Sequence, residues 1–110
     1  MDSELNILTK SVLKFRDDRN WEQYHNLKDL AVCLNIEAGE LLELFLWKKP
    51  EEVNKMKLQE ELADVFYSTL LLAHESGIDL NLALTEKLKS NALKYPVEKS
   101  YGKREKYDEI

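Results

Sequence analysis

Residues that end strands and helices are scarce in this chain, and this scarcity limits the possible folds more than any other feature. The 110 residues include 3 Gly and 2 Pro. β-Sandwiches and β-barrels need a turn about every 8–12 residues, and glycine and proline supply many of those turns. Because 44% of the residues are hydrophobic, there is enough apolar material for a core. We therefore expect an all-α protein whose residues 1–110 form a single domain.

Hydrophobic periodicity and capping residues predict four helices. They are expected over residues 3–19, 26–48, 53–76 and 79–94. Ser3, Asn26 and Asp79 are expected N-caps, and Gly77 is suited to end the third helix. Residues from about 97 to 110 carry mixed charges and are predicted to form a tail. Four antiparallel helices with short connections predict a four-helix bundle.

Charge and composition disfavour several classes of partner. The net charge is −5, with 21 acidic and 16 basic residues, so a general nucleic-acid surface is not expected. The longest apolar run, residues 70–73, is far shorter than a membrane span of about 20 residues. The single cysteine, Cys33, allows no internal disulfide and is interpreted as a packed small apolar residue. With no leader-like pattern at the N-terminus, we expect a soluble, cytoplasmic protein.

Two of the predicted helices carry carboxylates where their patterns require apolar side chains. On the second helix, a seam of leucines is interrupted at Glu37, and Glu40 follows three residues later on the same side. On the third helix, residues 62–73 are apolar in almost every direction and are expected to be buried. Asp64 lies inside this stretch, and Glu61 precedes it by three residues. The pattern brings two carboxylate pairs, one from each helix, toward the core.

Four carboxylates in one place repel one another unless they are protonated or share a cation. Oxygen ligands without a Cys/His cluster predict Mg²⁺, with Mn²⁺ as the alternative. The competing interpretation is that these are ordinary surface glutamates of amphipathic helices. A di-iron site is disfavoured because it needs two Glu-x-x-His motifs, and the chain has only Glu22-x-x-His25.

Several motifs, in order and at matching separations, resemble the MazG-like nucleotide pyrophosphohydrolases of the all-α NTP pyrophosphatase superfamily. They are Glu37-Ala-Gly-Glu40-Leu41, Trp47 and residues 60–65, Glu-Glu-Leu-Ala-Asp-Val. Within this superfamily the segment at residues 20–25, Asn-Trp-Glu-Gln-Tyr-His, is similar to the small dCTP-pyrophosphatase type. Residues 77–80, Asn91 and residues 94–97 resemble later parts of that subgroup. The resemblance covers about residues 10–97.

This resemblance implies hydrolysis of nucleoside triphosphates, often deoxynucleotides such as dCTP, to the monophosphate and pyrophosphate. It implies Mg²⁺ held by Glu37, Glu40, Glu61 and Asp64, and homodimers or homotetramers with active sites near subunit contacts. It also implies that Trp21 and Trp47 help to enclose the base, although a core role is the ordinary interpretation of a tryptophan. Either Glu40 or Glu61 is a candidate general base.

The fourth predicted helix offers a face for phosphate oxygens. Lys87, Asn91 and Lys94 recur at steps of four and three residues, and Tyr95 follows. The alternative is a solvated lysine face. His25 could bind the ligand or satisfy a loop carbonyl.

The sequence therefore predicts a Mg²⁺-dependent nucleotide pyrophosphohydrolase with a nucleoside triphosphate substrate. The alternative is a non-catalytic helical interaction module whose carboxylate pairs form salt bridges across an interface. The apolar side chains over residues 41–46 point in nearly every direction, which favours burial against another subunit.

Overall fold

The computed structural model describes residues 2–109, and within them every regular element is helical. The elements are α1 (Glu4–Asp18), η1 (Glu22–Tyr24), α2 (Leu27–Glu43), η2 (Pro50–Glu52), α3 (Lys55–Ser76), α4 (Leu80–Lys94) and α5 (Val97–Ser100). The expected all-α class is confirmed. None of these helices is both long and apolar enough to cross a bilayer.

Side-chain caps begin the four long helices. Ser3, Asn26 and Asp79 accept hydrogen bonds from backbone N–H groups three residues onward, as the sequence predicts. Gly77 ends α3 in the left-handed conformation with φ of 69°. The start of α3 differs from the prediction: Asn54 is its N-cap and accepts from the N–H of Lys57, so α3 begins two residues later than the expected residue 53.

α2 is shorter than predicted, because it ends at Glu43 and not at Lys48. The backbone N–H groups of Leu44, Phe45 and Leu46 bond to carbonyls three residues back, which tightens the turn that ends the helix. Trp47 then takes a positive φ of 62°, and Lys49 is extended before Pro50. The 17 residues of α2 make a rod of about 26 Å, since each residue rises about 1.5 Å.

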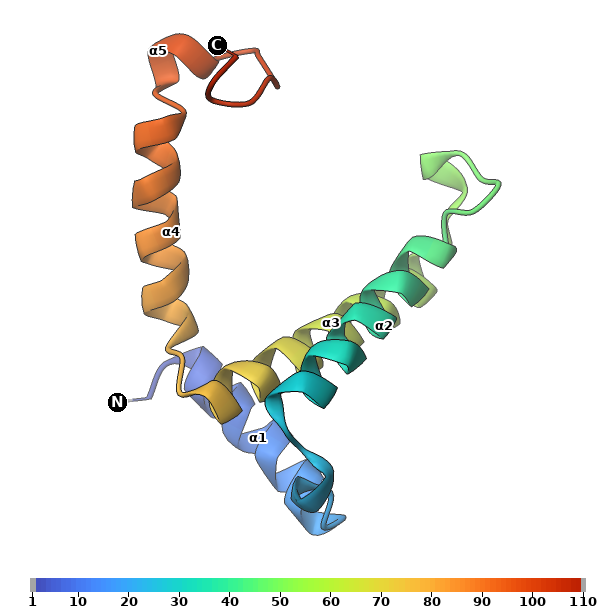
Figure 1. Ribbon diagram of the computed structural model, residues 1–110. Helices are drawn as coiled ribbons and strands as arrows, with labels where there is room; N and C mark the ends of the chain where they lie inside the picture. The colour runs from blue at the N-terminus through green and yellow to red at the C-terminus, as the bar shows by residue number, and fades with distance from the viewer. Residues whose placement is uncertain (1, 110) are drawn as a thin grey trace. The chain divides into compact units, whose positions relative to one another are not determined.

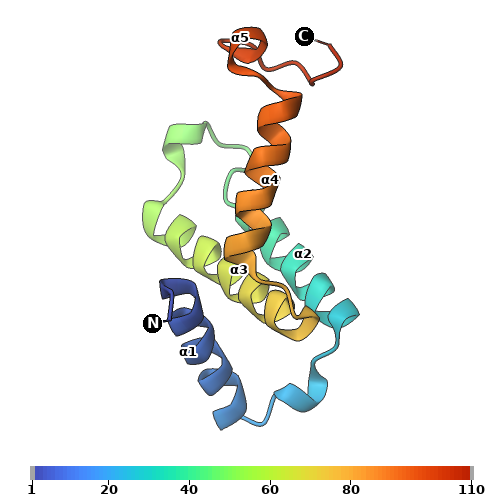
Figure 2. The same cartoon turned by 90° about the vertical axis from the view of Figure 1, so that its left-hand side faces the viewer.

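The contacts divide the chain into two compact units that meet between Ile78 and Asp79. In the first unit, α2 and α3 run antiparallel and side by side, and α1 packs on α3 (Figures 1 and 2). The second unit contains α4, α5 and the residues that follow. There the tail folds back: the ring of Tyr107 lies edge-on to Tyr95 at 6.0 Å and 5.2 Å from the Lys94 ammonium. The single domain and the four-helix bundle remain predictions.

The core of the first unit is small. Its most buried apolar side chains are Leu30 of α2 and Leu70, Leu71 and Ala73 of α3. The expectation that the whole of residues 62–73 is buried is wrong, because Leu62 is 51% and Phe66 42% exposed. The buried residues of the stretch, Ser68, Leu70, Leu71 and Ala73, all lie in its second half. Large apolar side chains of the first unit therefore lie outside its own core.

Candidate metal centre and pocket

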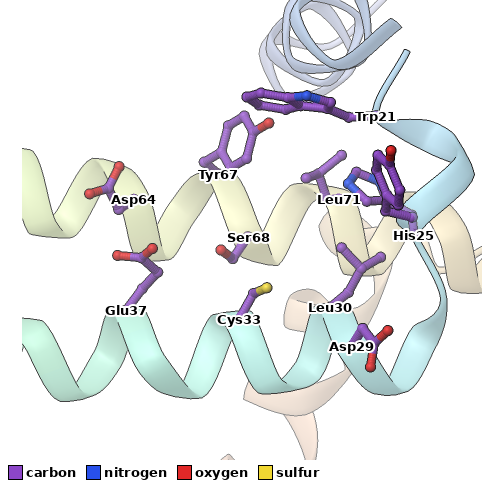
Figure 3. A pocket seen from close by; sticks show the side chains of 11 residues that line it. Trp21, His25, Asp29, Leu30, Cys33, Glu37, Asp64, Tyr67, Ser68 and Leu71 are labelled. Atoms are coloured by element: carbon purple, nitrogen blue, oxygen red, sulfur yellow. The ribbon is translucent and has the colours of Figure 1, made fainter. Parts of the chain in front are cut away.

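The antiparallel pairing of α2 and α3 brings carboxylates from the two helices together. One oxygen atom from each of Glu37, Glu61 and Asp64 lies within 4.8 Å of the others. Glu37 and Asp64 face each other across the gap between the helices (Figure 3). Glu40, one turn beyond Glu37, is exposed but within hydrogen-bonding reach of both Glu37 and Glu61. The four carboxylates that the sequence singles out therefore converge on one place.

The surroundings disfavour negative charge on two of these groups. Burial, hydrogen bonding with Glu40 and the charges of Glu40, Asp64 and Glu61 raise the pKa of Glu37 above its usual value. Burial also raises the pKa of Glu61, together with the charges of Glu40 and Asp64. As a metal-free set, the cluster is electrostatically strained at neutral pH.

The donor atoms fit a hard divalent cation. The Oε2 atoms of Glu37 and Glu61 are shielded from solvent and have no hydrogen-bond partner among residues 2–109. An oxygen shielded in this way normally has a partner, because leaving it without one costs free energy. Carboxylate oxygens from three or four side chains are the ligands that Mg²⁺ and Mn²⁺ prefer. A cation at this point would supply the missing partner and offset the repulsion.

A pocket of about 420 Å³ opens beside the cluster. Glu37 and Asp64 lie at one end of it, and Trp21 and His25 lie at the other (Figure 3). The rest of its lining is Tyr24, Asp29, Leu30, Cys33, Tyr67, Ser68 and Leu71. The Nδ1 atom of His25 is shielded from solvent and has no partner in the described part of the chain. A site with acidic groups at one end and aromatic rings at the other suits a ligand with a charged part and a flat part.

A second cavity, of about 480 Å³, adjoins the first between α1 and α3. Trp21, Asp64 and Tyr67 line both cavities. The α1 side of the second cavity consists of Leu8, Ser11, Val12 and Phe15. Phe15 packs edge-on against Trp21 at 5.8 Å and against Tyr67 at 6.1 Å. Aromatic side chains therefore form the partition between the two cavities.

Some residues that the sequence assigns to substrate binding lie elsewhere. Trp47 is 99% exposed and lines neither cavity. Lys87, Asn91, Lys94 and Tyr95 belong to the second unit, on α4 and at its end. Only Trp21 and His25 of this predicted set lie in the pocket.

The sequence interpretation missed several lining residues. Cys33 is exposed in the pocket and not packed in the core, which corrects the expectation for it. Cys33 precedes Glu37 by one helical turn, and Tyr67 and Ser68 follow Asp64 by one turn. Extending the faces of the carboxylates by three or four residues would have found all three. Tyr24 and Asp29 flank the start of α2, where no periodic signal exists.

Comparison with known proteins supplies relatives for this site. The MazG-like family model matches residues 32–110. The dCTP pyrophosphatase 1 of Bos taurus is 37% identical over 105 residues, and that of Homo sapiens is 36% identical. Each alignment covers 88% of this chain and 62% of the relative, so the chain spans less than two thirds of the length of these curated relatives.

Solved structures include a similar fold. The crystal structure of a pyrophosphatase from Archaeoglobus fulgidus matches with a TM-score of 0.81 and 36% sequence identity. The match covers 87% of this chain and 95% of that chain. The family match contains both carboxylate pairs, Glu37 with Glu40 and Glu61 with Asp64. Because the family model covers most of the sequence and the fold agrees, the chain belongs to the MazG-like family.

Proposed function

We propose that this chain is a metal-dependent nucleotide pyrophosphohydrolase. The reaction is hydrolysis of a nucleoside triphosphate, with dCTP as the first candidate, to the monophosphate and pyrophosphate. The observation that carries the proposal is the cluster of Glu37, Glu61 and Asp64, of which Glu37 and Asp64 line one end of a pocket whose other end is aromatic. The names of the relatives, dCTP pyrophosphatase 1 and a pyrophosphatase, support the same chemistry.

Glu37, Glu40, Glu61 and Asp64 would hold Mg²⁺, or Mn²⁺ in its place. When bound, such an ion neutralises phosphate charge and lowers the pKa of a water molecule. Glu40 or Glu61 would accept the proton of the attacking water. Glu40 suits this role because it contacts two of the clustered carboxyls while remaining open to solvent. The reaction then needs no covalent intermediate on the chain.

Recognition of the nucleotide would fall to the opposite end of the pocket. The ring of Trp21 offers a face on which a base stacks, a contact worth about 1–3 kcal/mol per base. The unpartnered Nδ1 of His25 is available for a hydrogen bond to the ligand. We assign Lys87, Asn91, Lys94 and Tyr95 to the phosphate oxygens, because two ammonium groups and an amide on one helix face suit that chemistry.

We further propose that the enzyme is a homodimer or homotetramer. Leu42 is 65%, Leu46 53% and Trp47 99% exposed on the single chain, although all three are large apolar residues. Burial of this surface against a second copy would remove it from water and would allow Trp47 to enclose a neighbour's base. Sedimentation equilibrium at micromolar concentration measures the oligomeric state. An active monomer would contradict both the oligomer and the role of Trp47 at a neighbour's base.

Product analysis tests the proposed reaction directly. The chain is incubated with dCTP and with the other common nucleotides, with Mg²⁺ or with EDTA, and the products are identified by phosphorus NMR. We expect monophosphate and pyrophosphate only when Mg²⁺ is present. Orthophosphate and a diphosphate as first products would indicate a different phosphatase. No turnover, with no thermal stabilisation by Mg²⁺ and nucleotide, would favour the non-catalytic interaction module.

A further inference from the structure

Arg16 is the most deeply buried charged residue that the structure describes. It is 3% exposed, although the sequence places it in the polar stretch that ends α1. A buried guanidinium loses its hydration and requires hydrogen-bonding partners to replace it. Its position and partners therefore indicate a specific role.

Three carboxylates from three elements surround the guanidinium. Nε donates to Asp17 at 2.9 Å, and Nη1 donates to Glu75, on the last turn of α3, at 2.7 Å. Nη2 forms an ion pair with Glu22 of η1 at 3.7 Å. Arg16 thus joins the end of α1 to the end of α3 and to the segment between α1 and α2.

The backbone of Arg16 holds the same segment. Its carbonyl accepts from the N–H of Trp21 at 3.1 Å, after a reversal in which Asn20 has a φ of 57°. Within the segment, the backbone N–H of Tyr24 donates to the carbonyl of Trp21, and the backbone N–H of His25 donates to the carbonyl of Glu22, both at 3.0 Å. Arg16 therefore fixes residues 21–25 at two independent points, one through its carbonyl and one through Glu22.

Trp21 and His25, in this segment, form the aromatic end of the pocket. The other anchor of Arg16, Glu75, follows Leu71 by one helical turn, and Leu71 also lines the pocket. We propose that Arg16 is a positioning residue: through Glu22 and Glu75 it fixes the Trp21–His25 segment against α3 and so shapes the nucleotide-binding end of the pocket.

This role differs from a contribution to stability. Buried ion pairs often add little net stability, because desolvation offsets the attraction. A preorganised wall, in contrast, lowers the entropy cost of binding a ligand. The proposal rests on the proposed function for its kinetic consequences, but the position of Trp21 can be measured without substrate.

The first test is Arg16→Met, which keeps an unbranched apolar stem of similar width but removes the guanidinium and its charge. We expect the KM for dCTP to rise about tenfold while kcat changes less than about threefold, because binding and not chemistry is impaired. The Mg²⁺ concentration for half-maximal activity should stay at the wild-type value. Arg16→Lys keeps the charge without the planar fork and should give an intermediate KM.

A second readout follows Trp21 directly. In a Trp47→Phe background, Trp21 is the remaining tryptophan, and acrylamide quenching of its fluorescence reports its exposure. Arg16→Met should raise the quenching constant in the absence of nucleotide. Lys14→Met is the matched control, because it removes an exposed ion pair with Asp18 on the same helix; KM and quenching should not change.

Glu22→Gln covers the case in which Arg16→Met does not fold. It cuts the ionic link to the segment while Arg16 keeps Asp17 and Glu75, and the Glu22 side chain is 65% exposed. We expect a rise in KM of about twofold and increased quenching, since an exposed pair is weak.

The outcomes separate the two proposals. A lowered Tm with wild-type KM and wild-type quenching in Arg16→Met would make Arg16 purely structural and overturn the inference. If Arg16→Met does not fold and Glu22→Gln does, an unchanged KM and unchanged quenching in Glu22→Gln would also overturn the inference. If the wild-type chain hydrolyses no nucleotide, the proposed function fails, and the quenching data still decide the role of Arg16.

Discussion

The two ends of the pocket are built by different kinds of structure. At the carboxylate end, Glu37, Glu61 and Asp64 project from the middle of two long helices that pack side by side. At the aromatic end, Trp21 and His25 lie on a short 3₁₀ turn and its flanks, which are held by contacts from Arg16. Helix geometry alone fixes the first end. In the proposed enzyme the second end also relies on the buried Arg16 side chain, so substitutions there would alter nucleotide recognition without altering the carboxylate end.

The largest effect should come from the carboxylate end. Glu37→Gln and Asp64→Asn each remove a ligand charge while keeping the size of the side chain. We expect Mg²⁺-dependent hydrolysis to fall by about 10³-fold or more, because a catalytic cation is lost or displaced. Circular dichroism should show an unchanged helix content. Turnover near the wild-type level in either variant would contradict the ligand assignment.

Substitution at the aromatic end should reduce activity less than substitution at the carboxylate end, and it should change KM more than kcat. Trp21→Ala removes a stacking surface, so the KM for dCTP should rise about tenfold or more while kcat changes little. Phe15→Leu removes the edge contacts of the Phe15 ring with Trp21 and Tyr67 but keeps the Trp21 ring itself; it serves as the control and should have a smaller effect. A fall in kcat with unchanged KM in Trp21→Ala would remove the distinction between the two ends.

A smaller effect is expected in the second unit, where Lys94 is proposed to contact a phosphate. Lys94→Met should raise the KM about threefold if its ammonium contacts a phosphate, since one exposed cation contributes modestly. Tyr107→Ala removes the ring that Lys94 contacts but keeps the ammonium charge. It therefore separates a phosphate contact of Lys94 from its packing on Tyr107. Equal KM values for wild type and Lys94→Met would exclude Lys94 from the site.

Without metal, the carboxylate cluster should make the thermal stability of the chain depend on pH. The pKa values of Glu37 and Glu61 are raised in the folded chain, so the folded state holds these protons more tightly than the unfolded state does. In EDTA, this contribution to stability is therefore lost as pH rises from the ordinary carboxyl pKa through the raised values. Glu37→Gln should raise the Tm at pH 7 by a few degrees in EDTA. Thermal scans across pH 4–8 measure this, and a lower Tm for the variant at pH 7 would argue against repulsion.

Sequence patterns predicted most of what periodicity governs. Residue type predicted the caps at Ser3, Asn26 and Asp79, and helix spacing placed each carboxylate pair on one face of its helix. The two pairs meet because α2 packs on α3. The burial of Arg16 and the early end of α2 do not follow from residue type or helix spacing. Arg16 is buried because distant Glu75 and nearby Glu22 meet it in space, which one-dimensional spacing does not encode. The residues after Glu43 are apolar in every direction, so no single face indicated where the helix ends.

The carboxylate cluster also has a consequence for folding kinetics. It lies across the seam where α2 and α3 pack, so docking of the two helices brings like charges together as their apolar contacts form. Without a divalent cation, monovalent salt should therefore speed refolding by screening this repulsion. A cation that binds only the assembled cluster acts after the docking step, so it should slow unfolding more than it speeds folding. The same carboxylates that delay assembly of the helices would then keep the finished structure closed.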